Sequence, residues 1–152
     1  MKKVMLMLAS IALAVFVSAA TYNNGLSGSQ TATPEADSIA LNLTATGDLP
    51  GVNTVKLQRD GVNVVGGTWR LSVLPPDANA SSNPRGELVG TVTGGSLTLN
   101  AQGTLASASS VQVVLHGGTG EFSNVTTGHA TMTISANAEN PSQLSGTLVL
   151  NF

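Results

Sequence analysis

The sequence predicts an all-β domain, and the architecture we favour is an antiparallel eight-stranded barrel. Apolar and polar residues alternate with a period of two from Asp37 onward, as in strands with one buried face. Gly, Asn, Asp and Pro interrupt this alternation at short intervals. The last segment, 144–152, carries an apolar stripe that closure into a barrel would protect from pairing with another molecule. A β-sandwich is the alternative, because spacing alone does not separate the two architectures.

The N-terminus has the three parts of a signal peptide, which we place over residues 1–20. Two lysines precede an uncharged, mostly apolar run over 4–17, and small residues then fit cleavage near Ala19 or Ala20. The run of about 14 residues is short for a helix that must cross about 30 Å of hydrocarbon, which disfavours a retained membrane anchor. We therefore expect an exported protein, periplasmic or extracellular.

The first half of the mature chain is expected to begin with a flexible segment over 21–36, since this stretch is polar and has no periodicity. A single β-barrel domain is expected over 37–152. Asp60-Gly61 predicts a hairpin turn, Gly66-Gly67 a bulge or bend, and the Pro-rich stretch 75–84 a loop. The strands predicted in this half are 39–45, 54–58, 62–65 and 69–73.

The second half alternates more regularly. Gly94-Gly95 predicts a turn between two strands, and Asn140-Pro141 closes the strand before the last one. The strands predicted here are 87–92, 97–99, 111–116, 131–136 and 144–152.

Charge and composition exclude several classes of function. Removal of the two signal-peptide lysines turns 6 basic and 8 acidic residues into 4 and 8, a net charge of −4. Four dispersed cations cannot form the basic face that nucleic acid or an anionic membrane requires. The chain has no Cys, which excludes thiol catalysis and Cys-based zinc sites. Aromatic residues make up only 3%, which argues against an extended stacking platform for sugars or bases.

The stretch 111–131, VQVVLHGGTGEFSNVTTGHAT, resembles a motif of the allene oxide cyclase and dirigent-protein superfamily. The closing SGTLVLNF, 145–152, looks like the last strand of that barrel. About 40 residues carry the resemblance. The matching positions are Gly117, Gly118, Thr119, Gly120, Phe122 and Gly128.

The resemblance implies an eight-stranded antiparallel barrel with a central apolar cavity, often assembled as dimers or trimers. In characterised members the cavity guides cyclisation or radical coupling of hydrophobic molecules without a cofactor. Where dirigent proteins have Ala-Arg-Gly, this chain has Thr126-Thr127-Gly128, so it offers no arginine at that place.

The glycines of this motif also have a direct physical interpretation. Residues without Cβ permit a sharp reversal after a strand, so Gly117-Gly118-x-Gly120 is expected to turn the chain and let Phe122 plug the barrel end. A phosphate-binding loop is disfavoured, because no Lys-Ser/Thr and no helix follow.

His116 and His129 are the only histidines, and both lie near this turn. With Glu121 they are the candidate catalytic residues, as an acid–base pair or as metal ligands. A closed metal site needs three or four ligands, so the simpler interpretation is that they face solvent at strand ends, and we predict no metal.

Trp69 and Arg70 are the candidate ligand-binding residues. They point to opposite faces of one strand, so Arg70 lies outside if Trp69 lines the interior. Arg70 would contact a ligand in the lumen only if the polar face were the inner one.

Three functions stay open at this point. The favoured one is a binding module that holds a small hydrophobic molecule in its lumen and needs no cofactor. Assembly into a homo-oligomer is left open. The alternatives are a cofactor-free cyclase or isomerase and a structural or surface-associated protein with a filled core.

Overall fold

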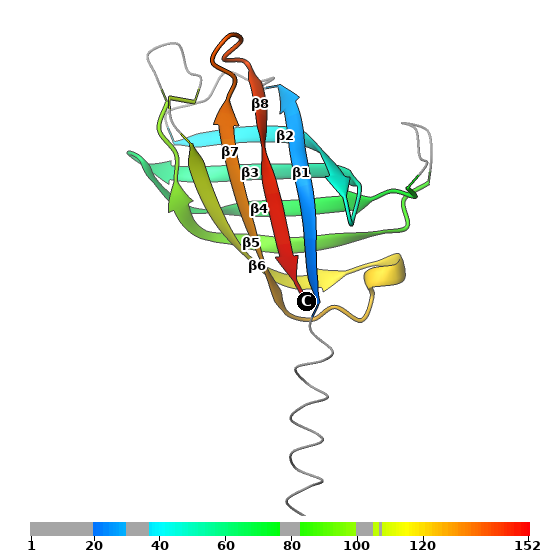
Figure 1. Cartoon of the computed structure of the whole chain (residues 1–152). Coiled ribbons are helices and arrows are strands. Elements are labelled where there is room, and N and C mark those ends of the chain that lie inside the picture. The colour runs from blue at the N-terminus through cyan, green and yellow to red at the C-terminus, as the bar shows by residue number, and fades with distance from the viewer. Residues whose placement is uncertain (1–19, 30–36, 77–82, 100–104, 107) are drawn as a thin grey trace, which may run out of the picture.

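The computed structural model describes residues 20–29, 37–76, 83–99, 105–106 and 108–152. Eight antiparallel strands close into a barrel in sequence order, which confirms the predicted fold class (Figure 1). The predicted signal peptide, up to residue 19, lies outside the described residues, as do 30–36 and most of the predicted loop 75–84. The strands are β1 (Thr21–Ser29), β2 (Ser38–Gly47), β3 (Gly51–Asp60), β4 (Asn63–Val73), β5 (Gly86–Ser96), β6 (Ser109–Gly118), β7 (Gly128–Ala136) and β8 (Gln143–Asn151).

Closure occurs between the first and the last strand. β1 pairs with β8 along its whole length, from Thr21 opposite Asn151 to Ser29 opposite Gln143. The other side of β8 pairs with β7, so β8 has no free edge at which another molecule could pair. This is the closed arrangement and not the sandwich alternative.

The expectation of a flexible segment over 21–36 is wrong for its first part, because Thr21–Ser29 is β1. This strand bonds to β2 on one side and to β8 on the other. Its Leu26 is buried in the core, and the buried Asn24 accepts a hydrogen bond of 2.8 Å from the Leu49 N–H. Two neighbouring strands and these contacts stabilise a segment whose polar composition alone does not predict a strand.

The expected turn at Gly94-Gly95 and strand at 97–99 are also wrong. Both glycines lie inside β5, where a β-bulge leaves Thr93 between Val92, opposite Val113, and Gly94, opposite Gln112. A bulge lets the strand continue while it bends, so no turn is needed. Leu99 makes only an isolated bridge with Leu105.

Two further predicted interruptions, at Asp60-Gly61 and at Gly66-Gly67, are confirmed. The chain turns at Gly61 and Val62 between β3 and β4. The register then shifts at the start of β4, where Val64 faces Arg59 and Gly66 faces Gln58, so that Val65 is the extra residue beside the predicted Gly66-Gly67 bulge.

The interior is filled with side chains from every strand. Alternate residues point inward, and the buried apolar side chains form one continuous cluster with the indole of Trp69 among them. Among the polar side chains that are buried in the described residues, Asn53 is fully buried and accepts a hydrogen bond of 2.6 Å from Trp69 Nε1. Its amide nitrogen lies 3.4 Å from the sulfur of Met132.

The end of the barrel at which β8 finishes is covered by the segment after β6. A single turn of 3-10 helix, η1 (Gly120–Phe122), lies there, and Phe122 is only 7% exposed, as expected of a plug (Figure 1). Gly120 has a φ of 58°, so the turn uses a conformation that favours glycine. Within the described ranges no helix is long and apolar enough to cross a membrane.

Candidate ligand-binding site

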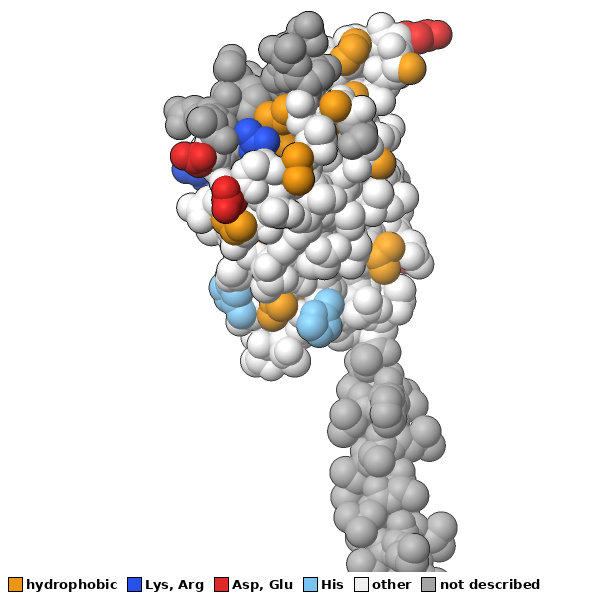
Figure 2. Space-filling model, turned by 90° about the vertical axis from the view of Figure 1, so that its left-hand side faces the viewer, with side chains coloured by type: hydrophobic (Ala, Val, Ile, Leu, Met, Phe, Trp, Pro, Cys, Tyr) orange, Lys and Arg blue, Asp and Glu red, His pale blue; other side chains and the backbone are white. Residues whose placement is uncertain are grey.

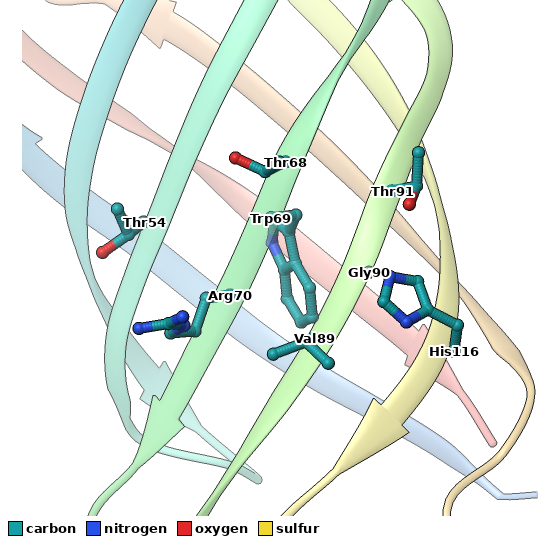
Figure 3. Close-up of a pocket in the computed structure, with 8 residues that line it drawn as sticks. All are labelled: Thr54, Thr68, Trp69, Arg70, Val89, Gly90, Thr91 and His116. Atoms are coloured by element: carbon teal, nitrogen blue, oxygen red, sulfur yellow. The ribbon is translucent and has the colours of Figure 1, made fainter.

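A depression of about 410 Å³ lies on the outer wall of the barrel over β3 to β6 (Figure 3). We call it the outer-wall depression. Most of its lining residues occupy the outward positions of these strands, while Trp69 and Gly90 belong to the layer beneath. The lining residues are Thr54, Thr68, Trp69, Arg70, Val89, Gly90, Thr91 and His116. Three of the sequence-predicted candidates, Trp69, Arg70 and His116, therefore meet here.

His116 owes its position to a second β-bulge. Val89 of β5 faces Gly117 of β6, and the next residue, Gly90, faces Leu115, so His116 is left without a partner on β5. A bulge re-aims the side chain of the extra residue. Figure 3 accordingly shows the imidazole leaning from β6 over β5 toward Gly90. The histidine is thus directed into the depression and not away from the wall.

The floor of the outer-wall depression is closely packed. Gly90 faces Trp69 across the β4–β5 pair, and a Cβ on Gly90 would lie 2.7 Å from both Val113 Cγ1 and the Val114 carbonyl oxygen. Trp69 is only 2% exposed, and its hydrogen bond to Asn53 fixes the indole from inside. Trp69 therefore supports the site from below, and its burial leaves Arg70, the next residue, on the outer face of the strand.

Arg70 supplies the positive charge of the site. Its side chain is 60% exposed, and its Nε lies 3.7 Å from a carboxylate oxygen of Glu87. An exposed ion pair at this distance contributes little, so an anionic ligand can compete for the guanidinium. Figure 3 shows Arg70 and Thr54 on one side of Val89 and His116 on the other. The two polar ends of the site thus flank an aliphatic patch.

His129 and Glu121 do not join this site. His129 lies on β7 opposite Val114 and faces outward, two register positions from His116, and Figure 2 shows both histidines separate on one face of the molecule. Glu121 accepts two hydrogen bonds from Arg85, of 2.9 and 3.1 Å, which hold its pKa below the ordinary value. Glu121 therefore fastens η1 to the residue that precedes β5. Among the described residues, no group of three His, Asp or Glu side chains could hold a metal ion.

Several residues of the site could not be found from the sequence. Thr54, Thr68, Val89 and Thr91 are ordinary outward residues of alternating strands, and only the pairing of β3 to β6 brings them together. The bulge that redirects His116 depends on the register between β5 and β6, for which the sequence has no local signal beyond the glycines that follow.

Comparison of the chain with models of protein families, with curated proteins and with solved structures found no match. The class of protein is therefore defined here by its fold and its site alone: a small closed antiparallel barrel with a polar depression on its outer wall.

Proposed function

We propose that this chain is an exported, non-enzymatic binding protein that holds a small organic anion in the outer-wall depression. The observation that carries the proposal is the placement of Arg70 and His116 at two sides of one depression of about 410 Å³, with Val89 between them. Small-molecule sites commonly combine such an apolar surface with a few placed polar groups.

The chemistry of the lining favours a carboxylate or phosphate ester with a compact apolar body. A guanidinium matches the planar oxygens of these anions, and an imidazole can donate or accept a hydrogen bond at the far end. Three threonine hydroxyls, from Thr54, Thr68 and Thr91, surround the site and can bond to further oxygens. The side chain of Val89 offers the surface on which the apolar body rests.

Binding is favoured over catalysis because the lining has few groups that transfer protons. His116 is the one imidazole among the lining residues, and the carboxylate beside the site, that of Glu87, lies outside the lining and is paired with Arg70. An acid–base mechanism of the cyclase type would need a second partner near the same substrate.

A hydrophobic molecule in the lumen is the second candidate. It is supported by the apolar side chains that fill the interior, and it is what the resemblance of residues 111–131 to the allene oxide cyclase and dirigent superfamily implies. Such a ligand would have to displace side chains that now pack as one cluster, Trp69 among them.

Export is supported by the sequence of residues 1–20, and N-terminal sequencing of the secreted protein tests it directly.

The experiment uses Trp69 as a reporter, because it is the one tryptophan of the chain and lies beneath the site. The fluorescence of the purified protein is followed during titration with benzoate, phenyl phosphate and the neutral control benzyl alcohol. We expect saturable binding of an anion and weak or no binding of benzyl alcohol. Arg70→Gln should weaken anion binding at least tenfold. Lys56→Gln, which removes an exposed cation of β3 outside the lining, should leave the affinity unchanged.

The outcomes separate the two candidates. Equal losses in the Arg70 and Lys56 variants would show nonspecific attraction and refute the outer-wall site. Saturable binding of decanoate that Arg70→Gln does not change, together with a co-purifying apolar mass in native mass spectrometry, would favour the lumen.

A further inference from the structure

Aromatic residues gather at one end of the barrel. Tyr22 at the start of β1 and Phe152 after β8 stack with ring centroids 4.6 Å apart and an angle of 20° between planes. Phe122 of η1 meets Phe152 edge-on at 6.2 Å. These are three of the four aromatic residues in the described part of the chain. Scarce aromatic surface is thus concentrated in one place.

A second depression, of about 430 Å³, opens beside these rings, and we call it the barrel-end depression. Tyr22 and Phe152 are half-buried, so each keeps part of its ring surface accessible. Asn124, Thr126 and Thr127 are exposed and carry the polar groups of the site. The lining contains no charged side chain and consists of Tyr22, Asn124, Val125, Thr126, Thr127 and Phe152.

The loop that carries the polar groups is anchored at its start. The backbone N–H of Ser123 bonds to the Gly120 carbonyl at 3.2 Å, and that of Val125 bonds to the Phe122 carbonyl at 3.0 Å. The ion pair between Arg85 and Glu121 fastens the same turn to the residue before β5. A site whose walls are set before the ligand arrives loses less entropy on binding.

Gly128 fixes the other border of the loop. A Cβ at this position would lie 2.9 Å from the Cβ of Phe152, so only glycine lets β7 begin directly against that residue. Phe152 therefore lies close to the end of the loop, and the exposed hydroxyl and amide groups stand next to aromatic surface.

We propose that the barrel-end depression binds one ring of a neutral sugar. A pyranose has an apolar face of C–H groups and a rim of hydroxyls, so it needs an aromatic surface and hydrogen-bonding side chains side by side. The barrel-end depression presents both. Because its lining is uncharged, it has no group that would favour an anionic sugar over a neutral one. The site takes a single ring, in keeping with the small number of aromatic residues.

This site is independent of the outer-wall depression. The two depressions share no lining residue. The barrel-end depression is formed by β1, the β6–β7 segment and the chain after β8, whereas the outer-wall depression is formed by β3 to β6. Loss of anion binding in the Arg70 variant therefore leaves this proposal unaffected.

The experiment is an NMR titration of the ¹⁵N-labelled protein with methyl β-D-glucopyranoside. We expect saturable millimolar binding, with chemical-shift changes concentrated at Tyr22, 124–127 and Phe152. Sorbitol, which has similar hydroxyls but no ring, should bind at least tenfold more weakly. Glucuronate should not bind more tightly than the neutral pyranoside.

Variants decide the roles of the polar and aromatic parts. Asn124→Ala/Thr127→Ala should weaken pyranoside binding at least tenfold, whereas Asn42→Ala/Thr44→Ala, a matched pair of exposed residues on β2, should leave it unchanged. Tyr22→Leu keeps apolar volume but removes the ring and should weaken binding at least fivefold. Shifts that do not saturate, equal binding of sorbitol, or an unchanged affinity in the Asn124/Thr127 variant would overturn the proposal. Because both residues of that variant are exposed, the test does not depend on whether Tyr22→Leu folds.

Discussion

Replacement of Asn53 by alanine should destabilise the barrel far more than an average substitution. Asn53 is fully buried and accepts the indole N–H of Trp69 at 2.6 Å. Its truncation leaves that buried donor without a partner, which costs about 1–3 kcal/mol. The lost packing contacts of the amide group add roughly 1 kcal/mol. We therefore expect a loss of about 2–4 kcal/mol in the free energy of unfolding, or roughly 8–16 °C in Tm for a domain of this size.

A double-mutant cycle isolates the contribution of the hydrogen bond. Asn53→Leu and Trp69→Phe each leave one buried polar group unsatisfied, whereas the double variant removes both partners at once. Its destabilisation should be smaller than the sum of the single costs by about 1–2 kcal/mol. Urea unfolding followed by far-UV circular dichroism measures all four proteins, because the Trp69 variants lack the fluorescent reporter. Costs that add to within about 0.3 kcal/mol would refute the reasoning.

Three further predictions concern the backbone and the charged surface. Gly67→Ala should cost about 2–4 kcal/mol in the free energy of unfolding, because φ is 140° and a Cβ would collide with a carbonyl oxygen of β3. Gly61→Ala, where φ is 63° and the space around the Cβ is open, should cost only about 1–2 kcal/mol, and similar Tm losses in both variants would contradict this. Asn24→Ala should cost about 1–3 kcal/mol, because the buried backbone N–H of Leu49 loses its acceptor, and hydrogen exchange should then rise first at the Leu49 amide; unchanged protection there would count against it. Since Arg85 lowers the pKa of folded Glu121, the pair stabilises the fold above the pKa of the unfolded carboxyl and ceases to do so as pH falls through the lower folded pKa. Glu121→Gln should therefore lower Tm slightly at neutral pH and show less loss of Tm on acidification than the unmodified protein, and parallel pH profiles would disprove that role.

Local alternation was enough to predict much of the barrel wall. Leu41, Leu71 and Leu148 lie inside as their positions in the pattern require, because the pleat of a strand sends successive side chains to opposite faces. Closure was predicted from the apolar stripe of the last strand. The strand that closes the barrel was not, because Thr21–Ser29 has one inward aliphatic residue, Leu26, and depends on partners far away in the sequence.

The candidate site was predictable only in part, for a similar reason. The sequence singles out Arg70 and His116 as candidate residues on strands, but their proximity depends on the register of β4, β5 and β6. The same holds for Gly94-Gly95, which marks a bulge here and a turn elsewhere. A pair of glycines indicates an unusual backbone conformation, and the pairing with the neighbouring strand decides whether it is a bulge or a turn.

The pairing of β1 with β8 also constrains the order in which the chain can fold. Thr21 and Asn151, which face each other at closure, are the first residue of the first strand and the last residue of the last. During synthesis β1 leaves the ribosome before any other strand, yet one of its two hydrogen-bonding partners is made last. Contacts between residues so distant in the sequence form slowly, because the chain loses the entropy of closing a long loop before it gains the free energy of the contacts. Until then the side of β1 that faces away from β2 is an open strand edge, and such edges make incompletely folded chains prone to aggregation.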